Sequence, residues 1–218
     1  MPHVSMRKVG GTARDLLEAL CEAVGPTGTL LMVLSAPDGE PFDALQSPVD
    51  TEDMGVFAEV FRTAPGVQVN DHAADRFAAR GSQAAFLLNP TPLHDYHGPG
   101  SVLERFVQAQ GFVLRLGANL DTITLTHHAE YLSDIPNKIR VRRLYVRADL
   151  GEQWIDSLDD SDGIAHWPKG DYFPQIWLDY RAAGRAQVGP IGACTAELFS
   201  SGDFVAFAVH WMNEYLRP

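Results

Sequence analysis

The sequence has few cysteines and few basic residues, and each shortage excludes a class of protein. Two cysteines among 218 residues, Cys21 and Cys194, are too few for a disulfide framework. We therefore interpret both as small core residues in a reducing cytoplasm. Lys and Arg together number 17 against 28 for Asp and Glu, which gives a formal net charge of −11. A chain this acidic lacks the basic surface that nucleic acids and anionic membranes require in a partner.

Long apolar runs and internal repeats are missing as well. No stretch approaches the roughly 20 apolar residues that a membrane span needs, and the first residues lack the apolar segment of a secretory signal. No repeat and no segment rich in Pro, Gly or Ser divides the chain. We therefore expect a single cytoplasmic domain over residues 1–218, with 45% hydrophobic residues to form its core and no membrane partner.

Strands and helices alternate along the chain. Short apolar runs closed by turn residues predict strands over 3–9, 28–35, 67–70 and 112–117. Amphipathic segments behind capping residues predict helices over 12–24, 53–63, 82–88, 121–132, 170–183 and 203–216, with one more after Ser101. This alternation predicts an α/β fold, a three-layer α/β/α domain with a largely parallel sheet. Residues 138–158 alternate with a period of two around Leu150-Gly151 and predict a β-hairpin.

The segment from Thr124 to Tyr131 holds the most informative pair of residues. His127 and Glu130 are three residues apart on an expected helix, so their side chains share one face. That face lies beyond the carboxyl end of a strand, where open α/β sheets form ligand crevices. A carboxylate that fixes an imidazole tautomer and stabilises the imidazolium is what a general base needs. A surface ion pair is the alternative interpretation. A zinc site is not indicated, because such helices carry two His at i,i+4 and need a third ligand.

Two glycine-containing turns are candidates for binding an anion. Gly10-Gly11-Thr12 lies between a strand and a helix, where backbone N–H groups attract phosphate, although a tight turn capped by Thr12 explains it equally. Ser101 with Glu104 forms a capping box, and the preceding Gly98-Pro-Gly turn also offers backbone donors. The cap and the ligand interpretations are compatible at Ser101.

Six blocks in order resemble one protein family. Residues 117–130, with their Gly, Thr, His and Glu, are similar to the pattern of the aminoglycoside 3-N-acetyltransferase family. The other five blocks are Pro2–Gly11, Asp53–Gly66 ("MG…E.FR..PG"), Asp71–Gly81, His97–Leu103 ("G.GSPL") and the pair Val188–Phe199 with Phe204–Met212. Six ordered blocks over most of the chain are far more specific than any one of them.

The resemblance implies an activity and a set of site residues. It implies an acetyl-CoA-dependent N-acetyltransferase that transfers acetyl to the 3-amino group of an aminoglycoside, without a metal, in antibiotic resistance or self-protection. It implies His127 and Glu130 as the catalytic residues. It assigns coenzyme binding to Ser5, Arg7, Gly10, Gly11, His72 and Ser101, and acceptor binding to Glu59, Asp159 and Asp160, whose carboxylates suit ammonium groups.

The chain also departs from the family pattern. It begins inside the first strand of that pattern, and it lacks a substrate-side loop between Ser35 and Phe42. The family's Pro and Ser in the second block are here Ala73 and Asp75. Two alternatives therefore stay open: an acyltransferase for a different amine, and a non-catalytic protein that binds coenzyme A or an aminoglycoside.

Overall fold

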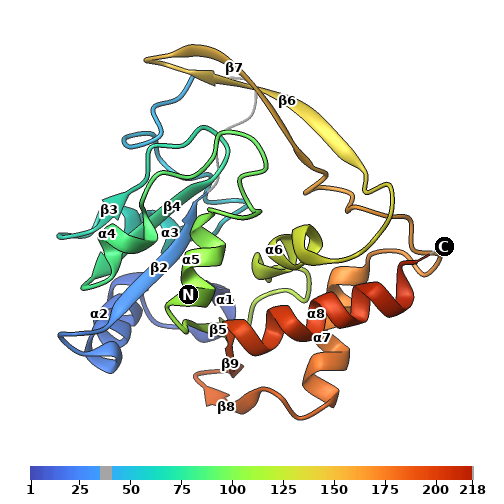
Figure 1. Cartoon of the computed structure of the whole chain (residues 1–218). Coiled ribbons are helices and arrows are strands. Elements are labelled where there is room, and N and C mark those ends of the chain that lie inside the picture. The colour runs from blue at the N-terminus through green and yellow to red at the C-terminus, as the bar shows by residue number, and fades with distance from the viewer. Residues whose placement is uncertain (35–40, 218) are drawn as a thin grey trace.

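The computed structural model describes residues 1–34 and 41–217, whose strands form three separate sheets. The main sheet has the order β1 (Pro2–Val4), β5 (Phe112–Leu116), β9 (Cys194–Ser200) and β8 (Gln187–Ile191). A second sheet joins β2 (Thr29–Leu34), β4 (Arg76–Gly81) and β3 (Gln68–Val69). The third is a hairpin of β6 (Arg140–Arg147) and β7 (Gly151–Leu158), as expected for residues 138–158. It projects away from the helices at the top of Figure 1.

The α/β class is confirmed, but the expected largely parallel sheet is wrong, because the main sheet is mostly antiparallel. The three-layer arrangement expected with it is not confirmed. In the described part of the main sheet only β1 and β5 run parallel, whereas β5 with β9 and β8 with β9 run antiparallel. β8 and β9 are joined by a tight turn, and such a short connection reverses the chain. Gly192 in that turn has φ +54°, and a Cβ there would lie 2.1 Å from the carbonyl oxygen of Val9.

Eight helices are described around these sheets. They are α1 (Met6–Val9), α2 (Ala13–Val24), α3 (Val56–Arg62), α4 (Ala84–Leu87), α5 (Val102–Gln108), α6 (Leu125–Leu132), α7 (Tyr172–Ala182) and α8 (Ser201–Tyr215). α2 begins at a capping box between Thr12 and Asp15 and buries Leu16 and Leu17, as its amphipathic pattern predicts. The part of the chain that the structure describes holds no helix long and apolar enough to span a membrane.

The larger apolar core fixes the helix that carries the candidate catalytic pair. α6 buries Leu125, Thr126 and Ala129, and its apolar residues pack in one cluster with Phe204 and Ala208 of α8. Figure 1 shows α6 beside α8. The first residue of α6 follows Thr124, which makes no side-chain capping bond, whereas the hydroxyl of Thr122 donates to the Asn119 carbonyl. The helix therefore depends on its buried face rather than on a cap.

A buried ion pair links the main sheet to the loop before α6. Arg115 on β5 donates to the carboxylate of Glu197 on β9, and its guanidinium lies 4.4 Å from the ring centre of Trp177. The same guanidinium donates to the carbonyl oxygens of Ala118 (3.1 Å) and Asn119 (2.8 Å). Arg115 therefore holds the loop that runs from the strand to α6.

We expect Glu197→Gln to lower the free energy of unfolding by about 3 kcal/mol, because it leaves the buried Arg115 charge uncompensated. Urea denaturation measures the loss. Glu214→Gln is the matched control, because the pair that Glu214 forms with His210 is exposed, and the substitution should cost less than about 0.5 kcal/mol. Equal stability of the two variants would contradict a structural role for the Arg115 pair.

Candidate active site

α6 places His127 and Glu130 in direct contact, as the spacing predicts. His127 Nδ1 lies 3.0 Å from Glu130 Oε2. Glu130 is 1% exposed, and its other oxygen accepts a hydrogen bond from the hydroxyl of Tyr172 at the start of α7. A carboxylate that accepts the Nδ1 proton leaves the lone pair of the ring on Nε2. The pair therefore has the arrangement of an oriented imidazole base.

The charge of Glu130 shifts the proton affinity of His127. Burial opposes the charged imidazolium, but the hydrogen bond and the negative charge of Glu130 outweigh burial and raise the pKa of His127 above its ordinary value. The imidazolium that forms on proton uptake is thus stabilised within the site.

Two aromatic rings clamp the imidazole of His127. His97 stacks on it with ring centres 5.1 Å apart and an interplanar angle of 15°. Phe173 contacts it from another side at 4.9 Å. His97, Tyr172 and Phe173 were not predicted as site residues from the sequence, because they lie in two segments far from α6 in the chain and no spacing relates them to it.

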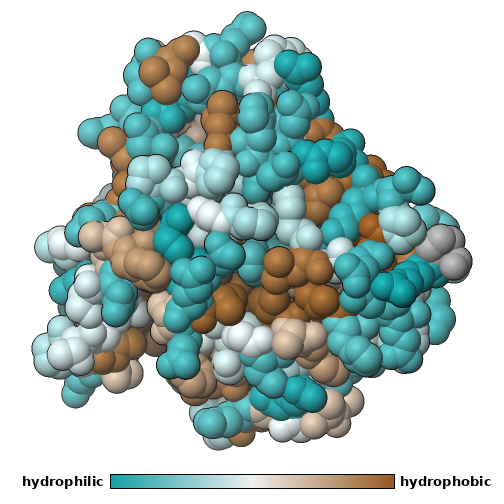
Figure 2. All heavy atoms as spheres, viewed as in Figure 1, coloured by the Kyte–Doolittle hydropathy of each residue, from teal (hydrophilic) through white to brown (hydrophobic). Residues whose placement is uncertain are grey.

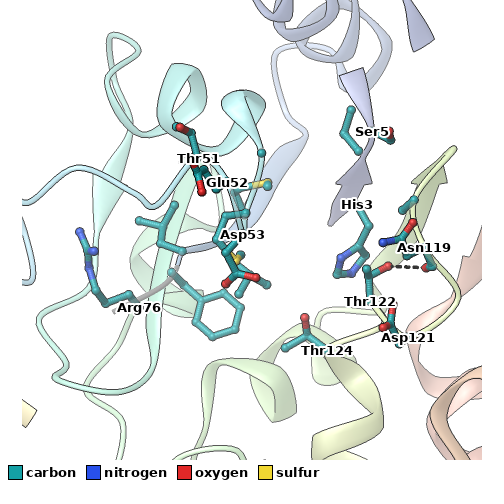
Figure 3. Close-up of a pocket in the computed structure, with 18 of the residues that line it drawn as sticks. His3, Ser5, Thr51, Glu52, Asp53, Arg76, Asn119, Asp121, Thr122 and Thr124 are labelled. Carbon is teal, nitrogen blue, oxygen red and sulfur yellow. Dashed lines mark hydrogen bonds between the residues drawn. The ribbon is translucent and has the colours of Figure 1, made fainter. Parts of the chain in front are cut away.

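Two adjoining cavities meet at His127. The larger, of about 960 Å³, extends from α6 to β1 and α1 and to the loop before α3. Figure 3 shows Glu52 and Asp53 on one wall, with His3 and Asn119 on the wall opposite and Thr124 below them. The smaller, of about 400 Å³, is bounded by residues 160–163 and 170–173. His127, Asp121 and Asp160 line both cavities.

The structure brings only some of the predicted coenzyme residues to this cavity. Ser5 and Arg7 line the larger cavity, together with Lys8. Gly10, Gly11, His72 and Ser101 are absent from the described residues that line either cavity.

His72 and Ser101 have structural contacts instead. His72 Nδ1 accepts from the backbone N–H groups of Ala74 (3.1 Å) and Asp75 (2.8 Å), while Nε2 faces the Pro92 carbonyl at 3.0 Å. Burial is the main reason that the pKa of His72 is lowered. Ser101 caps α5, and its hydroxyl also donates to the carbonyl of His97 at 3.3 Å. Both residues thus hold loops that lead to the cavity.

The three predicted acceptor residues lie in different surroundings. Glu59 pairs with Arg62 at 2.7 Å and lies outside the described lining of both cavities. Asp159 accepts from Arg143 at 3.0 Å and from the backbone N–H of Ser161, so it closes a turn. Asp160 accepts from the Tyr96 hydroxyl at 2.6 Å and from Arg143.

Asp160 places a negative charge at the junction of the two cavities. Burial alone would raise its pKa, but the hydrogen bond from Tyr96, the charge of His97 and the hydrogen bond from Arg143 together lower the pKa below its usual value. Asp160 is therefore ionised next to His127. Among the residues that the structure describes, no group of three His, Cys, Asp or Glu side chains is placed to hold a metal ion.

The fold and the site define a class: a mixed α/β protein with a buried His–Glu pair at the junction of two cavities. The family described as aminoglycoside 3-N-acetyltransferase matches residues 1–213, and the chain belongs to this family. The chain is 34% identical to aminoglycoside N(3)-acetyltransferase VII of Streptomyces paromomycinus, over 99% of this chain and 85% of that protein. It is 36% identical to aminoglycoside N(3)-acetyltransferase III of Pseudomonas aeruginosa, over 98% and 86%.

Solved structures agree with this membership. One described as AAC-IIIb in binary complex with CoASH has a TM-score of 0.91 at 33% identity, over 100% of this chain and 90% of that chain. Another, AAC-VIa bound to sisomicin, has a TM-score of 0.89 at 31% identity, over 98% and 90%. The alignment with the Streptomyces protein spans 246 residues, more than the 218 of this chain, so that relative carries segments without a counterpart here. The expected missing loop between Ser35 and Phe42 falls mainly on residues 35–40, outside the described residues.

Proposed function

We propose that this protein is an acetyl-CoA-dependent N-acetyltransferase that acetylates the 3-amino group of an aminoglycoside. The observation that carries the proposal is the 3.0 Å contact of His127 with the buried Glu130 at the junction of two cavities. Family membership supports the reaction, and the relatives with bound CoASH and bound sisomicin support the two ligands. The proposal takes residues 1–218 as one cytoplasmic domain.

The proposed reaction is direct transfer. The amine nitrogen attacks the thioester carbonyl carbon, the C–S bond breaks, and the thiolate leaves with its electron pair. His127 Nε2 takes a proton from the attacking nitrogen, and Glu130 stabilises the imidazolium. That proton then neutralises the thiolate. When bound, acetyl-CoA supplies the activated acyl group, so the side chains need only orient the acceptor and move protons.

The larger cavity fits a long anionic coenzyme. Ser5, Arg7 and Lys8 line the end formed by β1 and α1, where cationic side chains suit phosphate groups. The opposite end reaches His127, where the thioester must lie. The acidic side chains of Asp121 and Asp160 at that end suit an acceptor with several ammonium groups.

A thiol-release assay with acetyl-CoA and a panel of aminoglycosides tests the function. Release that depends on both substrates, with a product acetylated at the 3-amino group, supports it. Release with other amines alone would favour an acyltransferase for a different acceptor, an alternative to which the segments absent from this chain give weight. Binding of coenzyme without release would favour a non-catalytic protein.

We expect the double variant Asp159→Asn/Asp160→Asn to raise the KM for the acceptor more than the KM for acetyl-CoA. The reason is that Asp160 faces both cavities, and its loss leaves the positive charge of Arg143 near the acceptor. The wild-type KM should also rise with salt, because charge pairs are screened over roughly 8 Å at physiological ionic strength. Steady-state kinetics measures both effects.

Asp159→Asn alone is the matched control. Asp159 closes the turn and does not line the described part of either cavity, so this variant should lower the melting temperature and leave the acceptor KM within about twofold. An unchanged acceptor KM in the double variant would mean that other carboxylates bind the acceptor.

A further inference from the structure

A second imidazole–carboxylate pair lies against the first. His97 Nε2 is 3.4 Å from Asp75 Oδ1, and the His97 ring stacks on His127 at 5.1 Å. Both His97 and Asp75 line the larger cavity. The pair comes from two loops, one before β4 and one before α5.

Asp75 is unusual because it is a buried carboxylate with few polar partners. It is 1% exposed, and neither of its side-chain oxygens has a hydrogen-bond partner among the described residues. A buried carboxylate without hydrogen bonds is costly unless a cation accompanies it. The nearest cationic candidate is the imidazole of His97.

The proposed reaction leaves one proton unassigned. An aliphatic amine arrives as an ammonium group, which loses its proton spontaneously only near pH ~10. Two protons must therefore leave the nitrogen before the amide is complete. His127 accounts for the one that it passes to the thiolate. The other must leave before attack, because an ammonium nitrogen has no lone pair.

We propose that His97, supported by Asp75, removes this first proton from the ammonium group of the acceptor, so that the amine reaches His127 in its neutral form. The inference rests on the proposed function. When the ring proton is on Nε2, the nitrogen that lies 3.4 Å from Asp75 Oδ1, the lone pair of the neutral ring is on Nδ1. The N–H bond of the ammonium breaks, the proton joins Nδ1, and the nitrogen keeps the electron pair. Asp75 stabilises the imidazolium until the proton passes to solvent.

The surroundings of His97 keep it close to both reacting groups. The ring centres of Tyr96 and His97 are 4.6 Å apart. The backbone carbonyl of His97 accepts hydrogen bonds from the Ser101 hydroxyl at 3.3 Å and from His128 Nδ1 at 2.8 Å. The titratable and charged groups that face it or its carboxylate from neighbouring segments are Asp75, Tyr96, His72, Arg105, His127, His128 and Asp160. Asp160, whose pKa the charge of His97 helps to lower, is a second carboxylate near His97.

Variants compared across pH test the inference. We expect H97N to lower kcat on the order of 10²-fold at about pH 6.5, where solvent rarely frees the amine, and only a few-fold at about pH 9. D75N should show the same trend with a smaller loss, and the double variant should be no worse than H97N, because both residues act on one proton. H94N is the matched control, since His94 forms an exposed pair with Asp156 at 3.8 Å and should match wild type at every pH.

An acceptor with a weakly basic amine gives an independent readout. Such an amine is already neutral at about pH 6.5, so the difference between H97N and wild type should disappear with it. A loss in H97N that is equal at all pH values and with both acceptors, or a change in acceptor KM alone, would overturn the inference. If H97N does not fold, D75N with the two acceptors decides the same question. Failure of the wild type to release thiol with any aminoglycoside would instead contradict the proposed function.

Discussion

His127→Ala should lower kcat by about 10⁴-fold, at the upper end of the range for loss of a general base. The variant removes the proton acceptor from the junction of the two cavities and leaves Glu130 and Tyr172 in place. The coenzyme residues proposed on β1 and α1 are untouched, so binding of acetyl-CoA should stay within a few-fold of wild type. Steady-state kinetics and calorimetric titration with coenzyme measure the two effects.

His128→Ala on the same helix is the control. His128 points about 100° away around the helix, and its Nδ1 contacts the His97 carbonyl rather than either cavity. Its loss should reduce stability and change kcat by less than about tenfold. A His127→Ala enzyme that keeps kcat within the same tenfold range would exclude His127 as the base.

Glu130→Gln should lower kcat by about 10³- to 10⁴-fold, because an amide reverses the hydrogen bond to the imidazole. The Tyr172 hydroxyl already donates to one carboxylate oxygen, so the glutamine oxygen stays there and the NH₂ group faces His127 Nδ1. The ring proton then moves to Nε2, and the base has the wrong tautomer. Crystal structures of the variant and its kinetics check the loss and its origin.

The same substitution changes the pH profile. In wild type the pKa of His127 is raised by Glu130, so activity should increase with pH through a pKa above the ordinary histidine value. In Glu130→Gln, burial still lowers the pKa of His127, but the negative charge of Glu130 that raises it is gone. The rise of activity with pH should therefore occur at lower pH. Tyr172→Phe keeps the Glu130 carboxylate, so its activity should still rise with pH through a pKa above the ordinary histidine value. If the pKa of the activity profile is the same in Glu130→Gln as in wild type, a group other than His127 controls the rise of activity with pH.

Some local features of the fold were predictable from the sequence, whereas others and the strand directions were not. Residues 6–9, for example, were expected in a strand and form α1. The period-two pattern of residues 138–158 predicted the β6–β7 hairpin, and the Thr12 cap predicted the start of α2. The β4 strand and the β8–β9 hairpin were not recognised as strands, although they form much of the two larger sheets. Their sequences mix polar and apolar residues, and alternation of strands and helices contains no information on which strands pair.

The candidate site divides in the same way. His127 and Glu130 were found because both lie on one helix, where spacing alone fixes their contact. Other parts of the walls, among them residues 75, 97, 160 and 172–173, are brought together only by the tertiary fold. His72 and Ser101 were predicted to bind coenzyme through the family pattern, whereas the structure gives each of them hydrogen bonds that hold a loop next to the cavity.

On the face seen in Figure 1, hydrophilic side chains cover most of the surface, with apolar side chains in a patch near the centre (Figure 2). The formal net charge of −11 suits a cationic acceptor better than an anionic polymer. This surface adds no separate site to the cavities described above.

The burial of α6 has a consequence for local unfolding. Its amides lie in the larger core against α8, so they should exchange their hydrogens only when the whole core opens. The loops 51–55 and 160–163 carry the acidic walls and have fewer buried apolar contacts, so they should open far more often. The base and its carboxylate thus keep their geometry while the walls around the acceptor fluctuate. We therefore expect these loops to accommodate acceptors of different shape while the contact between His127 and Glu130 is unchanged.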